Sequence, residues 1–577
     1  MRQLIYLLGA ALVISGCTQR NKPASDFSDF SNQFIDSLWK YHPVWASGSG
    51  YHAYDSMLPL PDSITRNQYV AFIDRVGGQM KQWNFESLTP AEKTDYQLID
   101  RFLASSVFYL FEFKSYQWDP SEYNIGGALD GAIANPDIPL EVRLRNVSLR
   151  LERVPAYYEA GQHSLRRISR EHTLLAIDQN KGLSYFFTQM FPDSLQKSSL
   201  SDVEKSLFRE RMSKADKAIQ GYITYLEDRL KNDTASLRDF RIGKDLYLKK
   251  FQYDIQSRYS ADEVYAKALN RKNELTNEMY QLAVTLWPKY HAGEALPKDT
   301  LTVISGTINK IAIHHCERDS LLTTIEQELP KLAVFIHEKQ LIDLDSTKPL
   351  RVRKTPAYMA GVAGASINSP GPYEKNASTY YNVTPLDGYT NEKAESYLRE
   401  YNDYMLSILN IHEAIPGHYT QQIYANRSPS LVKNILGNGA MIEGWACYVE
   451  SMMVEAGYRQ SPEMQLIYDK WKLRECCNFL LDYNIQVNGW GEKEAVELLS
   501  HQAFQETAEA REKYKRATLT QVQLTSYFTG DLEIKELRKE MELKQGNKFS
   551  LKSFHEKFLS YGSAPVEAIR QLMLGSN

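Results

Sequence analysis

Apolar residues recur every three or four positions along most of residues 28–300, with charged residues between them. This spacing matches the 3.6-residue turn of an α-helix that buries one face. The segments 141–170 and 260–287 show the pattern most clearly, and Ser260 followed by Glu263 is typical of a helix start. No repeat of fixed period occurs, which argues against a solenoid. We therefore predict an N-terminal helical region over residues 28–300.

The pattern changes between residues 349 and 390. Three short segments there, 350–353, 361–367 and 378–384, are rich in β-formers or in small residues. Proline and glycine lie between them, as in Ser369-Pro-Gly-Pro. Helical spacing resumes at about Asn391 and continues to the end of the chain. The chain is therefore predicted to be mainly α, with a small sheet in a second region that covers residues 301–577.

The first residues have the features of a secretory signal. Arg2 precedes an apolar run from Leu4 to Ile14, which is too short for a permanent membrane helix. Ile14-Ser-Gly-Cys17 resembles the bacterial lipobox, in which removal of the signal exposes the cysteine for lipid attachment. We predict a signal peptide over 1–16, a lipidated Cys17 with a flexible spacer over 17–27, and a lipoprotein of the bacterial cell envelope, on the periplasmic side or the outer membrane. The alternative is an ordinary cleaved signal with an incidental cysteine.

Composition and charge exclude several classes of protein. The 577 residues include 67 Lys and Arg against 71 Asp and Glu, a formal net charge of -4, and there is no long basic stripe. Nucleic acid is therefore not an expected partner. Gly and Pro are not in excess, which excludes disordered and collagen-like chains. Beyond Cys17 there are four cysteines, too few for a disulfide framework, and we expect them to be buried.

Only one of three His-Glu pairs has a second histidine close behind it. The pairs begin at His337, His412 and His555, and only His412-Glu-Ala-Ile-Pro-Gly-His418 supplies two imidazoles for one ion. We interpret His337 and His555 as helix-surface or packing residues. The cluster His314-His-Cys316 lacks a fourth ligand nearby and is interpreted as structural.

The two histidines of this motif are six positions apart, and on a straight helix they could not both bind one ion. Six positions correspond to about 9 Å of rise and about 120° of rotation, too far for two bonds of ~2.0–2.1 Å. Pro416 has no N–H to bond the carbonyl of His412, and Gly417 gives the backbone freedom to turn. We predict a kink or bulge at Pro416-Gly417 that absorbs two residues and brings His418 beside His412. The alternative is a helix end with two unrelated histidines.

A third ligand is expected from a carboxylate on a nearby helix. The apolar segment Met441-Ile-Glu443-Gly-Trp-Ala-Cys-Tyr-Val-Glu450 follows the second histidine, and a carboxylate in such a helix must be paired or metal-bound. We predict Glu443 as the third ligand, so that residues 404–456 contain the zinc helices. Glu450 is either a partner of a histidine ligand or an exposed residue.

Glu413 has a different predicted role. It follows a ligand on the same helix and is free to take a proton from water bound to a single Zn2+ ion, because zinc lowers the pKa of that water to roughly 7. Three protein ligands leave the fourth position open, which is typical of a catalytic rather than a structural zinc site.

These motifs carry a family resemblance over nearly the whole mature chain. The chain resembles the bacterial domain-of-unknown-function 885 family, which its motif groups with His-Glu zinc peptidases that use a glutamate as third ligand. The similar segments are Tyr41-His-Pro-Val-Trp-Ala-Ser-Gly-Ser-Gly-Tyr-His-Ala-Tyr-Asp55, the two zinc motifs, Gln523-x-x-x-Tyr527-x-x-Gly530 and Phe554-His-Glu-x-x-Leu-x-x-Gly562. The resemblance implies a helical zincin body of the thimet and carboxypeptidase Taq type, with a deep channel over the metal.

The resemblance also implies residues beyond the zinc ligands. Related zinc peptidases place a tyrosine that donates to the oxyanion, and Tyr527 is the candidate here, with core packing as its alternative. Arg516 is a candidate clamp for a substrate carboxylate. The strand 378–384, which contains Tyr380, is expected to pair with an extended substrate. The chain departs from the family pattern at Tyr419 and Gln486, where a histidine is common or usual, and at Gln521-Val522, where Pro-Gly is common.

The leading hypothesis is a zinc-dependent peptidase, tethered to a membrane by its N-terminal lipid, that hydrolyses peptide substrates with Glu413 as general base. One alternative is a non-catalytic helical lipoprotein that binds sugars or peptides for uptake. Another is a zinc hydrolase of esters or non-peptide amides, since the same ligands would serve it.

Overall fold

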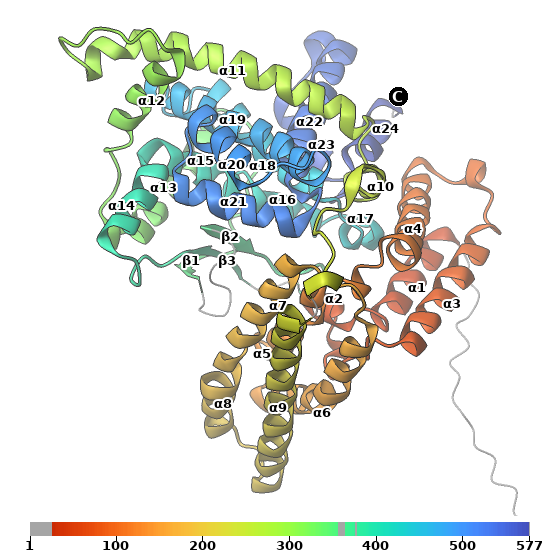
Figure 1. Cartoon of the computed structure of the whole chain (residues 1–577). Coiled ribbons are helices and arrows are strands. Elements are labelled where there is room, and N and C mark those ends of the chain that lie inside the picture. Colours follow the sequence, from red (N-terminus) through yellow and green to blue (C-terminus); the bar gives the residue numbers. More distant parts are fainter. Residues whose placement is uncertain (1–25, 233, 356–363, 375–377, 576–577) are drawn as a thin grey trace, which may run out of the picture.

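The structure of the chain is a computed structural model that describes residues 26–232, 234–355, 364–374 and 378–575. The predicted signal peptide, Cys17 and nearly all of the spacer lie outside these ranges. Helices dominate the described residues, and three short strands form one sheet (Figure 1). The prediction of a mainly α fold with a small sheet is therefore confirmed. None of the described helices is both long enough and apolar enough to cross a membrane.

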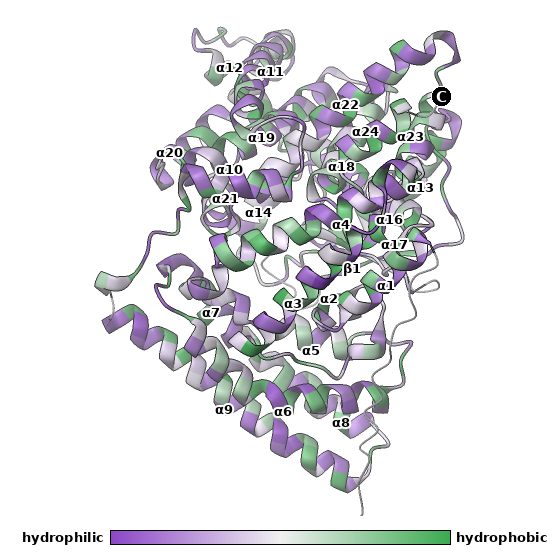
Figure 2. Ribbon diagram, turned by 90° about the vertical axis from the view of Figure 1, so that its right-hand side faces the viewer, coloured by the Kyte–Doolittle hydropathy of each residue, from purple (hydrophilic) through white to green (hydrophobic). Residues whose placement is uncertain are grey.

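Five consecutive helices form a side lobe with a hydrophobic core of its own. Val147, Leu151, Phe191 and Tyr222 are fully buried in that core. Figures 1 and 2 show these helices beside one another and apart from the rest of the molecule. The helices of the side lobe are α5 (Gly126–Ile133), α6 (Leu140–Ser164), α7 (Arg170–Gly182), α8 (Phe191–Lys197) and α9 (Asp202–Asn232).

The helices before and after the side lobe share one larger core and form the main body. The cores therefore do not follow the predicted boundary near residue 300. The main-body helices before the sheet are α1 (Phe27–Trp39), α2 (Pro43–Gly48), α3 (Ser63–Met80), α4 (Pro90–Phe108), α10 (Gly243–Asp254), α11 (Ala261–Tyr290), α12 (Thr300–Ile311) and α13 (Leu321–Glu338). Those after it are α14 (Asn391–Glu400), α15 (Asp403–Glu413), α16 (His418–Ala425), α17 (Leu431–Ile435), α18 (Gly439–Glu455), α19 (Pro462–Gln486), α20 (Glu492–Val496), α21 (Thr507–Thr520), α22 (Ser526–Gln545), α23 (Leu551–Leu559) and α24 (Val566–Gly575).

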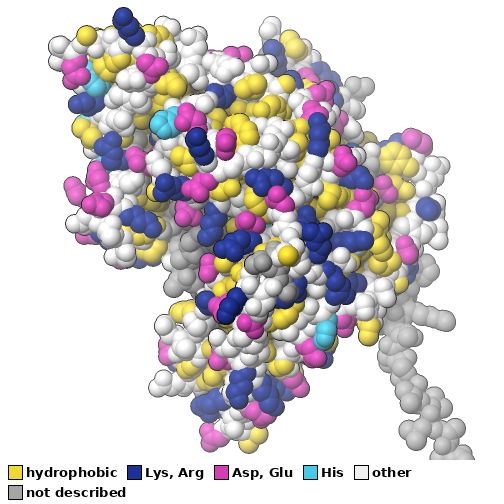
Figure 3. Space-filling view, in the orientation of Figure 1, with side chains coloured by type: hydrophobic (Ala, Val, Ile, Leu, Met, Phe, Trp, Pro, Cys, Tyr) yellow, Lys and Arg dark blue, Asp and Glu magenta, His cyan; other side chains and the backbone are white. Residues whose placement is uncertain are grey.

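Local signals in the sequence explain several helix boundaries. Ser260 caps α11, and Glu263 reaches back to it, so the predicted helix start is confirmed. The predicted helical segment 141–170 divides into two helices, because α6 ends at Ser164 and α7 begins at Arg170 with Ser169 as its cap. Acidic and basic side chains both occur across the face drawn in Figure 3.

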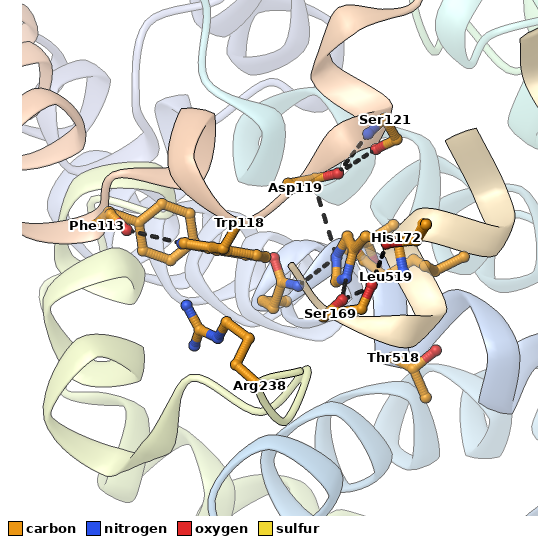
Figure 4. A network of polar contacts seen from close by, with 12 residues as sticks. Phe113, Trp118, Asp119, Ser121, Ser169, His172, Arg238, Thr518 and Leu519 are labelled. Carbon is orange, nitrogen blue, oxygen red and sulfur yellow. Dashed lines mark hydrogen bonds and ion pairs between the residues drawn. The ribbon is translucent and has the colours of Figure 1, made fainter. Parts of the chain in front are cut away.

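The side lobe joins the main body where the chain enters and leaves it. The backbone N–H of Ser169 donates to the Trp118 carbonyl, and that of Arg238 donates to the Ile168 carbonyl, so entry and exit lie side by side. Figure 4 shows Trp118 between the Arg238 guanidinium, 4.4 Å from the ring centroid, and the ring of His172. His172 is buried, and its Nε2 lies 3.2 Å from the carbonyl of Leu519 at the end of α21. The lobe is thus an insertion anchored against the segment that leads to Tyr527.

The sheet contains β1 (Leu350–Lys354), β2 (Ala365–Asn368) and β3 (Thr379–Val383), close to the three predicted segments. The strand order is β1-β3-β2, with β3 parallel to β1 and antiparallel to β2. β3 therefore lies in the centre and has no open edge. The expectation that the strand 378–384 pairs with a substrate is wrong, because both of its backbone edges are already paired within the sheet.

Helices α18 and α22 cross at two glycines. A Cβ atom on Gly444 would lie 2.4 Å from the Cα of Gly530, so neither helix can carry a side chain at this crossing. The contact fixes the distance between Glu443, beside Gly444, and Tyr527, one turn before Gly530. Close packing of the two backbones thus connects the fold to the predicted site.

Replacing Gly444 by alanine is expected to destabilise the protein by about 1–3 kcal/mol, because the methyl group would force the two backbones apart. The matched control is Gly221→Ala in the exposed middle of α9, where nothing lies within 4 Å of the new Cβ. That change is expected to stabilise the helix by up to about 1 kcal/mol. Calorimetric melting temperatures measure both effects. Equal melting temperatures for the two variants would contradict the tight crossing.

Candidate metal centre

The backbone between the two histidines of the motif turns sharply. Helix α15 ends at Glu413, the peptide bond before Pro416 is cis, and α16 begins at His418. A Cβ atom on Gly417 would lie 1.8 Å from the carbonyl oxygen of His412, so only glycine fits there. The structure therefore has a helix end and a new helix where a kink or bulge within one helix was predicted. The reason is that the Gly417 N–H turns back to donate to the Ile411 carbonyl (3.0 Å).

The turn brings the two imidazoles together. Their ring centroids are 4.8 Å apart and their planes are nearly perpendicular. Glu443 reaches the same point from α18, with Oε2 at 3.7 Å from His412 Nε2 and 3.5 Å from His418 Nε2. The Glu443 side chain is 22% exposed, so the cluster opens to solvent on one side.

The spacing of these three groups fits a shared metal ion. A direct N–H···O hydrogen bond spans 2.7–3.2 Å, and both Glu443 contacts are longer. Two ligands of a tetrahedral zinc with bonds of ~2.1 Å lie about 3.4 Å apart, close to the observed separations. All three ligand atoms lie within 4.8 Å of one another. Two imidazoles and a carboxylate are also ligands that zinc accepts.

Electrostatics tie the three groups to one another. Burial alone would lower the pKa of His412, but the neighbouring carboxylates of Glu443 and Glu450 outweigh it and raise this pKa well above its usual value. Burial would raise the pKa of Glu443, and the two imidazoles lower it instead. The cluster therefore carries a carboxylate that stays ionised over the whole physiological range.

Glu450 binds the ring nitrogen of His412 that faces away from Glu443. It is fully buried, and its Oε1 accepts a hydrogen bond of 2.6 Å from His412 Nδ1. This bond orients the ring so that Nε2 is the nitrogen that faces Glu443 and is available to an ion once it has lost its proton. Lys472 of α19 lies 3.4 Å from Glu450 and donates to Glu475 at 2.9 Å. Of the two readings of Glu450, the partner of a histidine agrees with this geometry, whereas an exposed residue does not.

A second group of possible ligands, His412, Cys447 and Glu450, shares this region. The direct hydrogen bond between His412 and Glu450 occupies the atoms that an ion would need. Burial, followed by the charges of Glu475 and Glu450, raises the pKa of the Cys447 thiol well above its usual value. The thiol therefore stays protonated, and we interpret this group as a hydrogen-bonding support.

Glu413 is the last residue of α15, and its carboxyl group lies within electrostatic reach of the two histidines and of Tyr381. Burial raises the pKa of its carboxyl group, and the charges of His418 and His412 oppose the shift. Tyr381 of β3 packs beneath it and donates to Asn410 Oδ1 at 3.0 Å. Asn410 in turn donates to the buried Glu328 carboxylate of α13 (2.8 Å), which keeps this end of α15 in place.

Tyr527 and Arg516 form a hydrogen-bonded pair whose tyrosine lies close enough to Glu443 to feel its charge. The Arg516 guanidinium donates to the hydroxyl of Tyr527 (3.1 Å) and to Oε1 of Gln523 (2.7 Å). Burial and then the charge of Glu443 raise the pKa of Tyr527 to about 12, so its hydroxyl stays protonated. Both residues are only half-buried.

Tyr380 is not brought to this centre. Side chains alternate along a strand, and its neighbour Tyr381 faces α15, so Tyr380 faces the other side of the sheet. There its ring packs against Arg353, with the guanidinium carbon 3.9 Å from the ring centroid. The prediction of Tyr380 as a substrate-binding residue fails for this reason.

The positions that depart from the family pattern lie away from the ligand atoms. Tyr419 donates to the Lys348 carbonyl (2.6 Å), and Gln486 donates to the Ala517 carbonyl (2.9 Å). Gln521 and Val522 both have positive φ, with 70° at Val522. Glycine tolerates the angle at Val522 and a β-branched residue seldom does. A proline at position 521 could not adopt the positive φ that Gln521 has here, because its ring fixes φ at about −65°, so a chain with Pro-Gly takes a different turn at this point.

Sequence reasoning missed several residues near the centre. Trp471 packs against His412 with ring centroids 6.2 Å apart, and Lys472 supports Glu450. Lys513 of α21 is also buried. Charged residues occur throughout α19 and α21 in the sequence, and this pattern is typical of helices with solvent-exposed faces. No local signal identifies α19 as a buried helix, or Lys513 as a buried residue of the partly exposed α21, because only their packing decides that.

Glu450→Gln is expected to weaken zinc binding about 10-fold, since outer partners of metal ligands contribute roughly 10- to 100-fold in affinity. The amide keeps the volume and an acceptor for His412 but removes the negative charge. Glu455→Gln, at the exposed end of the same helix, is the matched control and is expected to leave affinity unchanged. Competition with a chromophoric chelator measures the zinc dissociation constants of both variants. Equal constants would contradict the role of Glu450 in supporting His412.

The fold and the site define a mainly helical protein in which two imidazoles and a carboxylate converge as they would on a metal ion. The chain belongs to a bacterial family: residues 43–573 match the family described as "Bacterial protein of unknown function (DUF885)". No curated protein matches the chain.

Two solved structures resemble this protein over nearly their whole length. A candidate lipoprotein of unknown function from Shewanella oneidensis is 48% identical, with a TM-score of 0.86 over 96% of this chain and 100% of that one. A candidate lipoprotein from Colwellia psychrerythraea is 17% identical, with a TM-score of 0.78 over 95% of this chain and 98% of the other. The second likeness concerns the fold alone.

Proposed function

We propose that this protein is a zinc-dependent peptidase. The observation that carries the proposal is the convergence of His412, His418 and Glu443, at separations that suit a single ion, with Glu413 directly beside them. A bound zinc ion supplies Lewis acidity, which polarises a carbonyl group and lowers the pKa of a water ligand to roughly 7. His412, His418 and Glu443 would hold this ion.

Three further residues have separate roles in the proposed reaction. Glu413 is half-buried next to the cluster, accepts the proton of the attacking water and passes it to the leaving amine. Tyr527 keeps its proton and donates it as a hydrogen bond to the developing oxyanion. Arg516 holds the Tyr527 hydroxyl in place.

The fold supports this proposal in general terms. A mainly helical body with a small sheet beside the ligand cluster suits a zincin of the thimet and carboxypeptidase Taq type. We further propose that the chain is lipid-anchored at Cys17 in a bacterial cell envelope. The lipobox-like start and the two similar structures, both described as candidate lipoproteins, support this location.

Two measurements on the purified protein test the function. Mass spectrometry of the native protein is expected to find about one zinc per chain, and a mixed peptide library is expected to yield cleaved products. Zinc-free protein that binds peptides without cleaving them would instead identify an uptake lipoprotein. Cleavage confined to ester or non-peptide amide probes would identify a different zinc hydrolase.

A further inference from the structure

A polar cavity of about 170 Å³ lies between α16, α17, the segment that follows β2 and the N-terminal part of the main body. One water molecule occupies about 30 Å³ in the liquid, so the cavity has room for a group of several non-hydrogen atoms. None of the described residues that line it carries a charged side chain. Its polar walls include Ser49, Ser369, Gln422 and Asn434. The cavity therefore suits a neutral, polar group.

The segment after β2 forms a wall of this cavity that is fixed in place. A Cβ atom on Gly371 would lie 2.1 Å from the carbonyl oxygen of Ser49, so the two backbones are in direct contact. The backbone N–H of Tyr373 donates to the same carbonyl (3.4 Å), and the Asn426 side chain of α16 donates to the Pro370 carbonyl (3.0 Å). The wall is thus held from two sides, as in the largely pre-formed pockets that bind ligands.

Two side chains at the cavity carry polar atoms without partners. Both Oδ1 and Nδ2 of Asn434 are buried and form no hydrogen bond with any described residue, and the same holds for Oγ of Ser369. Burying an amide without hydrogen bonds is unfavourable, and natural proteins rarely leave such groups unpaired. Because the Asn434 amide offers one acceptor and one donor group, a ligand that carries both would complete it.

The cavity lies on the same helix face as a candidate metal ligand. His418, Gln422 and Ala425 are spaced by four and then three positions, so they share one face of α16. His418 belongs to the ligand cluster, whereas Gln422 and Ala425 line the cavity. At 1.5 Å per residue, these positions are about 6–10 Å from His418 along the helix. An extended peptide rises about 3.3 Å per residue, so a side chain about two or three residues from the carbonyl that is attacked can reach the cavity.

We propose that this cavity is a substrate subsite for a neutral carboxamide, the side chain of glutamine or asparagine, about two or three residues from the bond that is cleaved. The inference rests on the proposed peptidase function and narrows its substrates. A carboxamide has the same donor and acceptor groups as Asn434, so the two amides pair through two hydrogen bonds. A glutamate would place an uncompensated charge in a neutral cavity. A methionine would fill a similar volume but leave the Asn434 amide unpaired.

Peptide binding to the Glu413→Gln protein in the presence of zinc tests this subsite without requiring hydrolysis. Calorimetry compares three peptides with blocked ends, in which three alanines stand on either side of a central glutamine, glutamate or methionine. The symmetric flanks let the central side chain reach the cavity from either direction along the chain. The subsite predicts that the glutamine peptide binds about 10-fold more tightly than each of the others, as expected for two neutral hydrogen bonds.

Two variants of the cavity identify the residues responsible. Asn434→Leu removes both amide atoms with little change in size and is expected to abolish the preference for glutamine over methionine. Ser369→Ala is a smaller change that keeps the test open if the first variant does not fold, and it is expected to reduce the preference about two- to threefold. Asn277→Leu replaces an exposed asparagine on α11 and is the matched control, which should keep the full preference.

Equal binding of the three peptides, no binding of any of them, or a preference that survives both cavity variants would overturn the subsite. A wild-type protein that shows the preference but cleaves no peptide would refute the proposed peptidase alone and leave the cavity as a peptide-binding site.

Discussion

Glu413→Gln protein is expected to bind zinc as tightly as the wild type and to hydrolyse peptides about 10²- to 10⁴-fold more slowly. The amide keeps the size of the side chain, but it cannot accept a proton from the attacking water. Glu413 lies beside the ligand cluster without belonging to it, so the three ligand groups are unchanged. Steady-state kinetics and zinc analysis of the same preparation measure the two quantities.

The sequence offers a matched control for this experiment. Glu338 follows His337 in a second His-Glu pair, but both residues are exposed on α13. Glu338→Gln is therefore expected to keep full activity. If Glu413→Gln cleaved peptides at the wild-type rate, the assignment of a general base at this position would be wrong.

His418→Ala is expected to lose zinc affinity by more than the roughly 10- to 100-fold that an outer partner contributes, because it removes one of three donors. Zinc at 1,000 times its dissociation constant stabilises a protein by about 4 kcal/mol. The wild type should therefore melt at a higher temperature with zinc than without it, and the variant should not. Melting curves at several zinc concentrations give this comparison.

His337→Ala is the control for a histidine that lies on a helix surface. Zinc is expected to raise the melting temperature of this variant as it raises that of the wild type. The metal-free melting temperature of His418→Ala should stay close to that of the metal-free wild type, since His418 begins a helix at the edge of the site. If zinc raised the melting temperatures of both variants equally, His412 and His418 would converge without holding an ion.

The candidate ligands could be found in the sequence because few residues carry their chemistry. Only one His-Glu pair has a nearby second histidine, and Pro416-Gly417 indicates a break between the two. The form of that break was not predictable. It depends on the approach of Gly417 to the carbonyl of His412 and on the α18 helix, which presents Glu443 to the turn.

The error about the strand 378–384 has a related cause. β-Propensity identifies strands, but strand order depends on pairings between segments that are distant in sequence. The position of β3 between β1 and β2 closed both of its edges, and the packing of one face of the sheet on α15 turned Tyr381 toward the centre and Tyr380 away from it. The same limit applies to the side lobe, whose separate core is invisible in local periodicity.

By itself, the sequence determined the mainly helical class, the location of the small sheet and the identity of the candidate ligands. Helical periodicity, β-propensity and rare residue combinations are local properties, so a single chain reveals them. Tertiary structure alone decided that Glu450 holds His412, that α19 is buried, and that Arg516 hydrogen-bonds Tyr527. Burial and pairing depend on segments that meet only after folding, and the environment of each charge is set by those neighbours.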